Sequence, residues 1–413
     1  MTKRAILFTF LIAACYVCSA QVRDLPYFLQ QAQNASPLIK DYQNQVQSLG
    51  VDSELIRASY RPQVNGISNN VYAPIFHGFG YDNAISNGGQ ISAQVQVTKT
   101  FAGNNNLNTQ YRTIALDKTT IGINGSVAKR DLDKTVTAQY IVTYGDNVTV
   151  GFNREMLDLL QKEDTLLRAL TQNNVYKQAD YLTFYVTLQQ QELLYRQSEI
   201  QWRNDYAQLN YLCGINDTGA AVLPDPGIRI GEIPDAGGSL FYRQFLTDSL
   251  KNINQREVIR YSYKPKLSMF GDAGYLSSLA YEAQKNFGAS VGLTLNVPIY
   301  DGKQKKMKLS KIEIAERTRA NYRDFFVRQY SQQIAQLKQQ LRATEGLIEQ
   351  IGGQIKYART LIDVNAKLLE SGDVRITDLV LAVNTYLNAR NLLNQNHISR
   401  LQILNQIRYW QTP

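Results

Sequence analysis

Residues 337–362 read LKQQLRATEGLIEQIGGQIKYARTLI. Alternating steps of four and three separate Leu337, Leu341, Thr344, Ile348, Ile351, Ile355, Ala358 and Ile362. Such a heptad stripe is typical of a helix that packs lengthwise on another helix. No proline interrupts the run from Lys303 to the turn Ser371-Gly372-Asp373. At about 1.5 Å per residue this run would make a helix of roughly 100 Å. A compact domain is not that wide, so the stripe predicts a long coiled coil or a tube of helices.

The beginning of the chain is expected to be a secretory leader. Lys3 and Arg4 precede the apolar residues 5–14, and Cys18-Ser19-Ala20 resembles a cleavage site before Gln21. We therefore expect a signal peptide at 1–20 and an exported mature protein. The residues Ile12-Ala13-Ala14-Cys15 also resemble a lipoprotein box that would leave a lipid on Cys15. The sequence leaves both processing routes open.

Composition excludes few classes of protein. The chain has 413 residues, of which 44% are hydrophobic, and this could make two or three ordinary domains. Its net charge of +9 falls to +7 when Lys3 and Arg4 leave with the leader. The densest basic cluster, Lys303 to Lys308, could bind nucleic acid, but an exported protein rarely meets it. A solvated or lipid-headgroup-facing start of a helix is therefore favoured, and no nucleic-acid partner is expected.

The sequence contains an internal repeat. The first motif, Glu54-x-x-Arg57-x-Ser59-Tyr60-Arg61-Pro62, returns as Glu257-x-x-Arg260-x-Ser262-Tyr263-Lys264-Pro265. Three further pairs keep one order: Thr100-Phe101-Ala102-Gly103 with Ile299-Tyr300-Asp301-Gly302, Asn173-Asn174 with Ser371-Gly372, and Leu209-Asn-Tyr211-Leu212 with Ile407-Arg-Tyr409-Trp410. We therefore predict a first repeat at 21–213, a linker at 214–238 and a second repeat at 239–413.

Each repeat is expected to run helix, strand, loop, strand, very long helix, turn, helix. In the first repeat we predict helices at 24–59, 104–173 and 180–213, and strands at 63–73 and around 91–98. In the second we predict strands around 267–275 and 287–297, a helix from 303 to 371 and a last helix at 377–410. Apolar and polar residues alternate most clearly from Phe287 to Val297, which predicts a strand with one apolar face.

The strands have the length of membrane-spanning strands, which need roughly 9–11 residues. Alternation of this kind suits a barrel wall with lipid outside and water inside. Barrels close at eight or more strands, and lipid does not tolerate an open sheet edge. One chain offers four strands, so the chain is expected to oligomerise and share a barrel. Two copies would give a barrel filled by its own side chains, so a conduit needs at least three. A soluble antiparallel sheet remains an alternative, mainly for residues 63–73.

The chain resembles the TolC-type outer-membrane efflux proteins. The residues that carry this resemblance are Asn365-Ala366-Lys367-Leu368-Leu369-Glu370-Ser371-Gly372-Asp373, Asp378-Leu379-Val380, Tyr386-Leu387-Asn388-Ala389-Arg390 and Asn296-Val297-Pro298-Ile299-Tyr300-Asp301-Gly302. They match the family's glycine turn, an acidic residue six positions later, a Leu-Asn-Ala-Arg stretch and a strand-to-helix junction. The resemblance covers the chain from about Leu25 to Trp410.

The resemblance implies an α+β membrane protein. Long antiparallel helices, paired as in coiled coils, would form a helical barrel continuous with a small transmembrane β-barrel of four strands per protomer. It also implies a homotrimer in the cell outer membrane, with its helices in the periplasm and its closed tip against a periplasmic adaptor and an inner-membrane pump. The implied function is an exit duct for tripartite efflux or type I secretion, with no enzyme activity and no cofactor.

The same resemblance assigns candidate site residues. Asp378 matches an acidic residue that lines the tip constriction, and Asp180 is its counterpart in the first repeat, whereas Leu381 stands where the family has a second acidic residue. Asp378 could equally cap the last helix, a position that Asp favours. The tip turns, with the adaptor contact, would comprise Asn173, Asn174, Lys177, Ser371, Gly372, Asp373 and Arg375, and the strand–helix junctions Gly103, Pro298 and Gly302.

Two expectations concern the backbone at these places. Gly372 and Asn174 are expected to adopt the left-handed conformation that ends a helix, because Gly and then Asn accept it best. Gly103 and Gly302 are expected to make turns that a β-carbon would strain. Lys177 and Arg375, beside the turns, are the candidate partners of the two acidic residues.

No pattern in the sequence indicates catalysis or a metal site. His77 and His397 are far apart in sequence and neither has a ligand at metal spacing. Cys213 has no neighbouring base. Two other functions stay open beside the exit duct. A general porin would be nearly all strand, whereas this pattern is mostly helical. A periplasmic coiled-coil scaffold anchored at the outer membrane would explain the helices without a membrane-spanning sheet.

Overall fold

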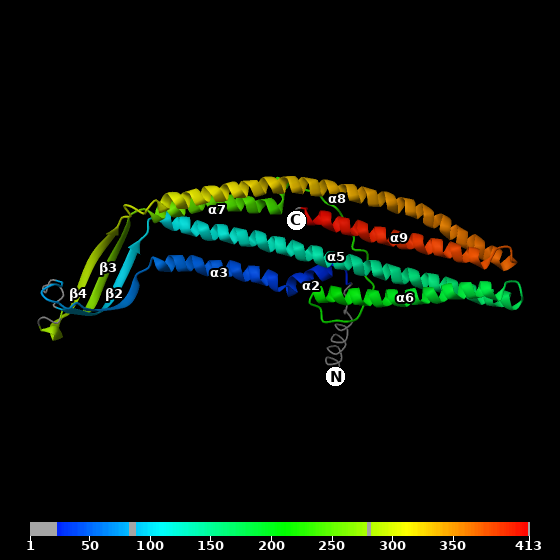
Figure 1. Cartoon of the computed structure of the whole chain (residues 1–413), viewed down its shortest axis with the longest axis horizontal. Coiled ribbons are helices and arrows are strands. Elements are labelled where there is room, and N and C mark those ends of the chain that lie inside the picture. The colour runs from blue at the N-terminus through cyan, green and yellow to red at the C-terminus, as the bar shows by residue number, and fades with distance from the viewer. Residues whose placement is uncertain (1–22, 82–87, 279–281, 412–413) are drawn as a thin grey trace, which may run out of the picture. The chain divides into compact units, whose positions relative to one another are not determined.

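The computed structural model describes residues 23–81, 88–278 and 282–411. The predicted leader with Cys15 lies outside these residues. The described chain forms two compact units (Figure 1). Unit 1 contains residues 23–40, 126–239 and 327–411, and unit 2 contains residues 41–125 and 240–326. Each unit takes segments from both repeats, so the units do not follow the predicted repeat boundaries, and those boundaries remain a proposal.

The element order repeats as predicted. The first half contributes a helix, two strands, a long helix and a further helix, and the second half contributes the same series. The first long helix, α5 (Asn104–Gln172), has 69 residues, and the second, α8 (Gln304–Ser371), has 68. They are followed by α6 (Gln178–Leu212) and α9 (Ile376–Tyr409). The predicted bounds of these four helices are confirmed to within two residues. For all their length, the described helices include none with the apolar stretch needed to cross a membrane.

The prediction of one helix at residues 24–59 is wrong in one respect, because this segment forms two helices. These are α2 (Leu25–Ala35) and α3 (Pro37–Ser59). Ser36 between them is extended, with ψ 116°, because a residue that precedes proline is disfavoured in the helical conformation. Asp24 accepts a hydrogen bond from the backbone N–H of Tyr27 and so caps α2. The corresponding helix of the second half, α7 (Leu240–Ser262), is continuous and follows the short 3₁₀ helix η1 (Ala236–Gly238).

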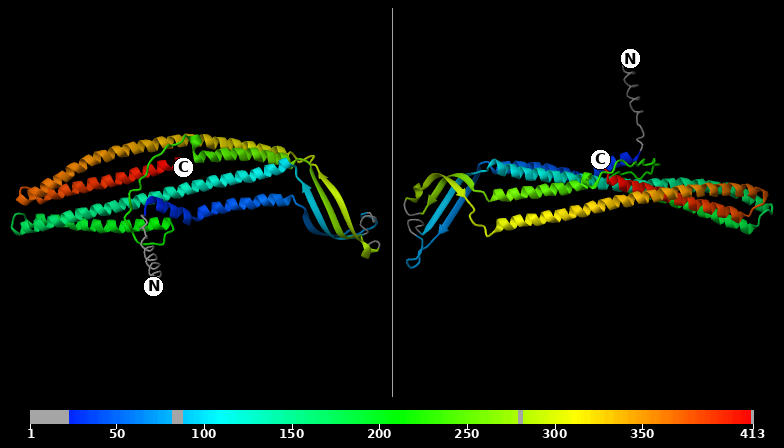
Figure 2. Two further views of the ribbon diagram at one scale, coloured as in Figure 1. Left: turned by 180° about the vertical axis from the view of Figure 1, so that it is seen from behind. Right: turned by 90° about the horizontal axis from the view of Figure 1, so that it is seen from above.

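The heptad stripe of α8 faces inward, as predicted. Leu337, Ile351, Ala358 and Ile362 are buried, and the four intervening stripe positions are half-buried. In unit 1 the last two of these buried residues join a core cluster with side chains from α5, α6 and α9, among them Met156 of α5. Figure 2 shows these helices from two further sides. Burial of this stripe holds the long helix against its neighbours along its length.

A second core cluster in unit 1 joins α2 to α5 and α6. Phe28 packs edge-on against Tyr140, with ring centroids 5.8 Å apart, and against Tyr206, at 6.2 Å. The Tyr140 hydroxyl donates to the carbonyl of Pro224 at 2.8 Å. This bond fixes the linker between the repeats on the helices, because a buried hydroxyl needs a partner.

Unit 2 contains a sheet of four antiparallel strands in the order β1-β2-β3-β4. The strands are β1 (Gln63–Tyr72), β2 (Gly89–Phe101), β3 (Lys266–Ser277) and β4 (Phe287–Asn296). Two of them come from each repeat, and β2 pairs with β3 across the repeats. A second 3₁₀ helix, η2 (Ala283–Lys285), lies in the connection between β3 and β4. All four predicted strands are confirmed.

The register of the sheet brings the apolar residues of three strands to one face. Leu295 lies opposite Leu267, and Leu293 opposite Met269. Residues opposite one another in an antiparallel pair share a face, so β4, β3 and β2 contribute one apolar row each. The side chains on this face include Val95, Leu267, Met269, Val291, Leu293 and Leu295, and each is exposed in the single chain. The opposite face carries Ser, Thr, Asn and Gln, with Asp272 bonded to Ser290 at 2.8 Å.

Two apolar residues of β3 break the alternation. Leu276 lies on the polar face, opposite Ser92 of β2. Phe270 lies on the same face, opposite Gly292 of β4. Its ring fills the space that a β-carbon at Gly292 would need. An aromatic side chain can thus cover a glycine on a neighbouring strand, which explains the position of Phe270 on the polar face.

Candidate functional site

The first candidate turn connects α5 to α6 in unit 1. Asn174 has φ 62°, the left-handed conformation predicted for it. The backbone N–H of Val175 donates to the carbonyl of Leu170 at 2.9 Å. This bond spans the end of the helix as in a Schellman motif, in which one left-handed residue reverses the chain. Lys177 then takes the N-cap position of α6.

The second candidate turn has the same geometry between α8 and α9. Gly372 has φ 80°, and the backbone N–H of Asp373 donates to the carbonyl of Leu368 at 3.0 Å. Arg375 takes the N-cap position of α9. The Ser371 hydroxyl bonds to the carboxylate of Asp373 at 2.6 Å. The two turns therefore match residue for residue, and the prediction of a left-handed residue at Asn174 and Gly372 is confirmed.

The acidic residues of the two repeats lie in the first turns of their helices. Asp180 is in the first turn of α6, and Asp378 is in the first turn of α9. Neither is an N-cap residue, so the interpretation of Asp378 as the cap is wrong. The carboxylate of Asp378 instead accepts two hydrogen bonds from the guanidinium of Arg375, at 3.1 and 3.2 Å. Such bidentate pairs are the stronger kind of surface ion pair.

Acidic residues of both repeats affect the pKa of Arg375. The hydrogen bond and the charge of Asp378 raise the pKa of Arg375, and the charge of Asp180 adds to this effect. The guanidinium therefore lies within the field of both carboxylates, and of the two it is Asp378 that it contacts. Among the described residues, Lys177 makes no ion pair within 4.0 Å, so only one of the two predicted basic partners is found in contact.

Tyr176 joins the two turns, and the sequence reasoning missed it. Its hydroxyl lies 2.9 Å from the carbonyl of Val374 and 3.0 Å from that of Leu369. Burial raises the pKa of Tyr176, so the hydroxyl keeps its proton and acts as the donor. A β-carbon at Gly372 would lie 3.4 Å from the Val175 side chain, so the second turn also contacts a side chain of the first. A lone tyrosine in a polar turn was the only local signal for this contact.

The strand–helix junctions lie where the sequence predicts them, in unit 2. β2 ends at Phe101 and α5 begins at Asn104, whereas β4 ends at Asn296 and α8 begins at Gln304. Gly302 has φ 64° and Lys303 follows it with φ 67°. Gly103 has no such conformation, and a β-carbon there would meet nothing within 4 Å. The expectation of a strained turn is therefore confirmed at Gly302 and wrong at Gly103, because the repeat conserves the place of the junction but not its backbone path.

The two glycines give a matched pair of substitutions. Gly302→Val should destabilise the folded chain by about 1–3 kcal/mol, because a β-branched residue is strained at positive φ. Gly103→Val should cost less, since neither its backbone nor its surroundings oppose a side chain, and it loses only the preference for glycine over valine at the start of α5. Thermal unfolding in detergent measures both effects. Equal losses of stability would mean that the left-handed residue does not limit the junction.

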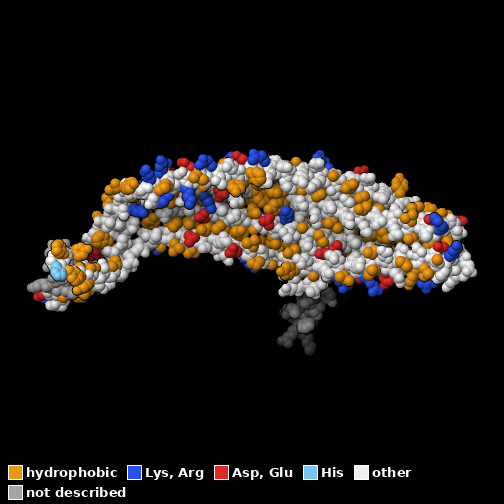
Figure 3. All heavy atoms as spheres, viewed as in Figure 1, with side chains coloured by type: hydrophobic (Ala, Val, Ile, Leu, Met, Phe, Trp, Pro, Cys, Tyr) orange, Lys and Arg blue, Asp and Glu red, His pale blue; other side chains and the backbone are white. Residues whose placement is uncertain are grey.

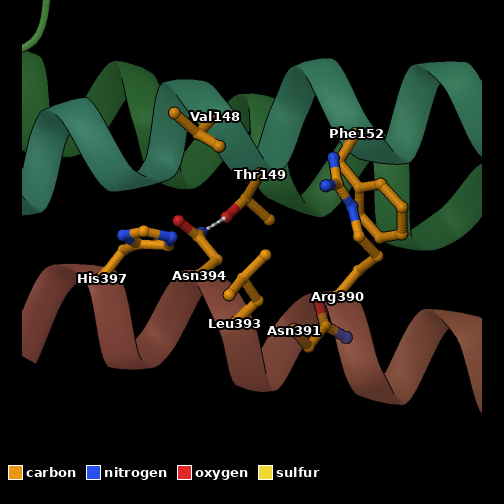
Figure 4. A pocket seen from close by; sticks show the side chains of 8 residues that line it. All are labelled: Val148, Thr149, Phe152, Arg390, Asn391, Leu393, Asn394 and His397. Atoms are coloured by element: carbon orange, nitrogen blue, oxygen red, sulfur yellow. Dashed lines mark hydrogen bonds between the residues drawn. The ribbon is translucent and has the colours of Figure 1, made fainter. Parts of the chain in front are cut away.

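A cavity of about 210 Å³ lies between α5 and α9 in unit 1 (Figure 4). It is lined by Val148, Thr149, Phe152, Arg390, Asn391, Leu393, Asn394 and His397. The side-chain amide of Asn394 donates to Thr149 at 2.6 Å, and the Arg390 guanidinium lies over the Phe152 ring at 5.1 Å. Burial lowers the pKa of His397, so its imidazole is neutral near pH 7. Two pairs of lining side chains, Asn394 with Thr149 and Arg390 with Phe152, are thus already in contact with one another.

The remaining reactive side chains are not assembled for chemistry. Cys213 is buried in the cluster around Phe28, and burial raises the pKa of its thiol to about 12. It therefore stays a protonated, packed side chain. Among residues 23–81, 88–278 and 282–411, no three His, Cys, Asp or Glu side chains are grouped so that they could hold a metal ion.

Comparison with known proteins finds similarity in structure and not in sequence. No protein-family model matches the chain, and no curated protein matches it. Among solved structures, it resembles CusC with a TM-score of 0.75 and 11% identity, over 95% of this chain and 93% of CusC. It resembles the outer membrane protein VceC from Vibrio cholerae with a TM-score of 0.71 and 13% identity, over 94% of this chain and 95% of VceC. It also resembles the Campylobacter jejuni outer membrane channel CmeC with a TM-score of 0.68 and 12% identity, over 94% of this chain and 85% of CmeC.

These similarities extend over nearly the whole chain. At 11–13% identity they establish the fold, which the chain has in common with CusC, which forms a transmembrane channel, with the outer membrane protein VceC and with the outer membrane channel CmeC. The α+β fold predicted in the sequence analysis, with long helices and four strands from two repeats, is therefore confirmed.

Proposed function

We propose that the chain is an outer-membrane channel that serves as the exit duct of a tripartite efflux or type I secretion system. The observation that carries this proposal is the exposed apolar face of the sheet. Val291 is 77% exposed and Leu293 is 69% exposed in the single chain. Monomeric soluble proteins rarely expose so continuous an apolar surface, and lipid is the environment that suits it.

The sheet also supports the trimer. Within the described residues, β1 and β4 each pair with one neighbouring strand, so each has an open edge. Open edges are not tolerated inside a bilayer, and four strands do not close a barrel. Three protomers would join β4 of one chain to β1 of the next and give a barrel wide enough to conduct. The polar face with Gln94, Gln96 and Asp272 would then line the water-filled interior.

The turns are the proposed closed end of the duct. The three copies of Asp378, with Asp180 beside them, would form its constriction. A periplasmic adaptor would contact the exposed turn residues, which are Asn173, Asn174, Lys177, Ser371, Gly372, Asp373 and Arg375. An inner-membrane pump would load the duct. This proposal puts the helices in the periplasm and the sheet in the outer membrane, where lipid surrounds it.

The two competing functions explain fewer of these features. A porin would consist mainly of strands, whereas α5 and α8 alone hold 69 and 68 residues. A periplasmic scaffold would need no sheet with one apolar and one polar face. The similarity to VceC, an outer membrane protein, and to CmeC, an outer membrane channel, also favours the duct.

The proposal is tested by assembly and insertion of the purified full chain. Detergent-solubilised protein, cross-linked and weighed, should be a trimer. After reconstitution into phosphatidylcholine vesicles it should stay with the lipid on flotation and resist carbonate extraction. A stable monomer in the membrane would contradict the shared barrel. Release from cell membranes without detergent would support the scaffold instead.

A further inference from the structure

The end of the sheet nearest the helices in unit 2 carries a concentrated positive charge. Five lysines lie there, and all five are exposed. They are Lys264, Lys303, Lys305, Lys306 and Lys308, which we term the basic junction surface. On the face drawn in Figure 3, Lys and Arg side chains are frequent along the first part of α8. Within the described part of the chain, none of the five makes an ion pair within 4.0 Å.

Contacts between the residues that follow α7 and the start of α8 hold part of this surface together. The ammonium groups of Lys305 and Lys308 both lie 5.5 Å from the centre of the Tyr263 ring. The ammonium group of Lys264, the next residue, lies 4.2 Å from the Tyr261 ring. Cation–π contacts orient these lysines without neutralising their charge. The nearby carboxylate of Asp301 accepts the backbone N–H of Lys305 at 2.6 Å and so serves the start of α8.

The lysines of the basic junction surface follow beyond the end of the apolar face of the sheet. The last apolar pair of β3 and β4 is Leu267 with Leu295, next to Asn296. Beyond Asn296, Ile299 is 95% exposed and Tyr300 is 83% exposed. The order from the strand outward is therefore apolar, aromatic and then basic. This is the order of a bilayer, in which hydrocarbon gives way to an interface that favours Tyr and then to phosphate head groups.

We propose that the basic junction surface binds the head groups of anionic phospholipids in the leaflet next to the helices. This proposal rests on the proposed function, because it requires the sheet to span a membrane. A groove of about 340 Å³ between Lys264, Lys266 and residues 101–106 extends the surface toward the first junction. Charge complementarity and continuity with the apolar face select lipid as the partner. A lysine next to an anionic bilayer contributes about fivefold to binding, so several together give a marked preference.

The test compares two variants of the full chain that lose the same charge. The first carries Lys303→Gln, Lys305→Gln, Lys306→Gln and Lys308→Gln. The control carries Lys338→Gln, Arg342→Gln, Lys356→Gln and Lys367→Gln, which are exposed positions further along α8. A second junction variant carries only Lys305→Gln, Lys306→Gln and Lys308→Gln. It keeps Lys303, because φ 67° at this residue makes it sensitive to substitution. Native mass spectrometry in detergent measures binding of phosphatidylglycerol against phosphatidylcholine.

The wild type and the control should prefer phosphatidylglycerol by about tenfold or more, and the junction variants should fall to within about twofold. Raised salt should weaken the preference of the wild type, because the charges are exposed. Retention of the preference in both junction variants, or an equal loss in the control, would overturn the proposal. Insertion into phosphatidylcholine vesicles separates the two hypotheses. Protein that inserts there without a preference for phosphatidylglycerol refutes only the lipid site, whereas failure to insert into any vesicle refutes the proposed channel.

Discussion

Val291→Lys is expected to abolish stable insertion of the protein into lipid bilayers. Val291 lies in the middle of β4 on the apolar face, opposite Gly271 of β3. A lysine on the lipid face of a barrel costs about 2–4 kcal/mol near the bilayer midplane. In a trimer the substitution occurs three times, so the total penalty is comparable to the stability of a typical domain. Flotation with phosphatidylcholine vesicles measures the loss, and trimer recovered from cell membranes should fall with it.

The neighbouring position provides the control at the same depth. Ser290 points to the opposite face, where its hydroxyl bonds to Asp272. Ser290→Lys should insert normally, because its ammonium group would face water and could pair with that carboxylate. Leu295→Lys, close to the end of β4, should have an intermediate effect, since the penalty falls to about 0–1 kcal/mol near the interface. Equal behaviour of Val291→Lys and Ser290→Lys would mean that the apolar face does not contact lipid.

The strands were predictable because successive side chains of a strand point to opposite faces of the sheet, so apolar and polar residues alternate along the sequence. The alternation from Phe287 to Val297 located β4 (Phe287–Asn296) to within one residue. The register then followed from the same pattern, since a slip by one residue would move every apolar side chain to the polar face. Phe270 was irregular in the sequence, and only its pairing with Gly292 explains it.

The helix break at Ser36 could have been predicted as well. The rule that a residue before proline leaves the helical conformation ended the first helix correctly at Pro62, and it applies equally at Pro37. A helix that continued through Ser36 would put this residue in the conformation that the following proline disfavours.

The candidate site was predictable only in part. Asn174 and Gly372 were found because a helix end imposes a residue preference that the repeat displays twice. Tyr176 was missed because its two carbonyl partners lie 193 and 198 residues away. A contact of this kind depends on how the two helical hairpins pack, which local patterns do not contain. Gly103 was overinterpreted, since a repeat can keep a residue without keeping its conformation.

Arg375→Gln and Asp378→Asn are expected to change the ion selectivity of the channel in opposite directions. This prediction rests on the proposed trimer, in which three Arg375–Asp378 pairs would surround the closed end. Each pair is nearly neutral, because two hydrogen bonds of 3.1 and 3.2 Å join the guanidinium to the carboxylate. Removal of Arg375 leaves three unpaired carboxylates, which favour cations and bind multivalent cations. Removal of Asp378 leaves three guanidinium groups, partly offset by Asp180.

Conductance in planar bilayers measures both changes. Arg375→Gln should raise the cation-to-anion permeability ratio severalfold and strengthen block by trivalent cations, whereas Asp378→Asn should lower the ratio and weaken the block. The double variant should return toward the wild type, because the two groups act on one another and their separate effects do not add. Asp324→Asn is the matched control, since it removes one carboxylate from an ion pair with Arg323 far from the turn along α8. If all four variants keep the selectivity and block of the wild type, the Arg375–Asp378 pair lies outside the ion path and other residues form the constriction.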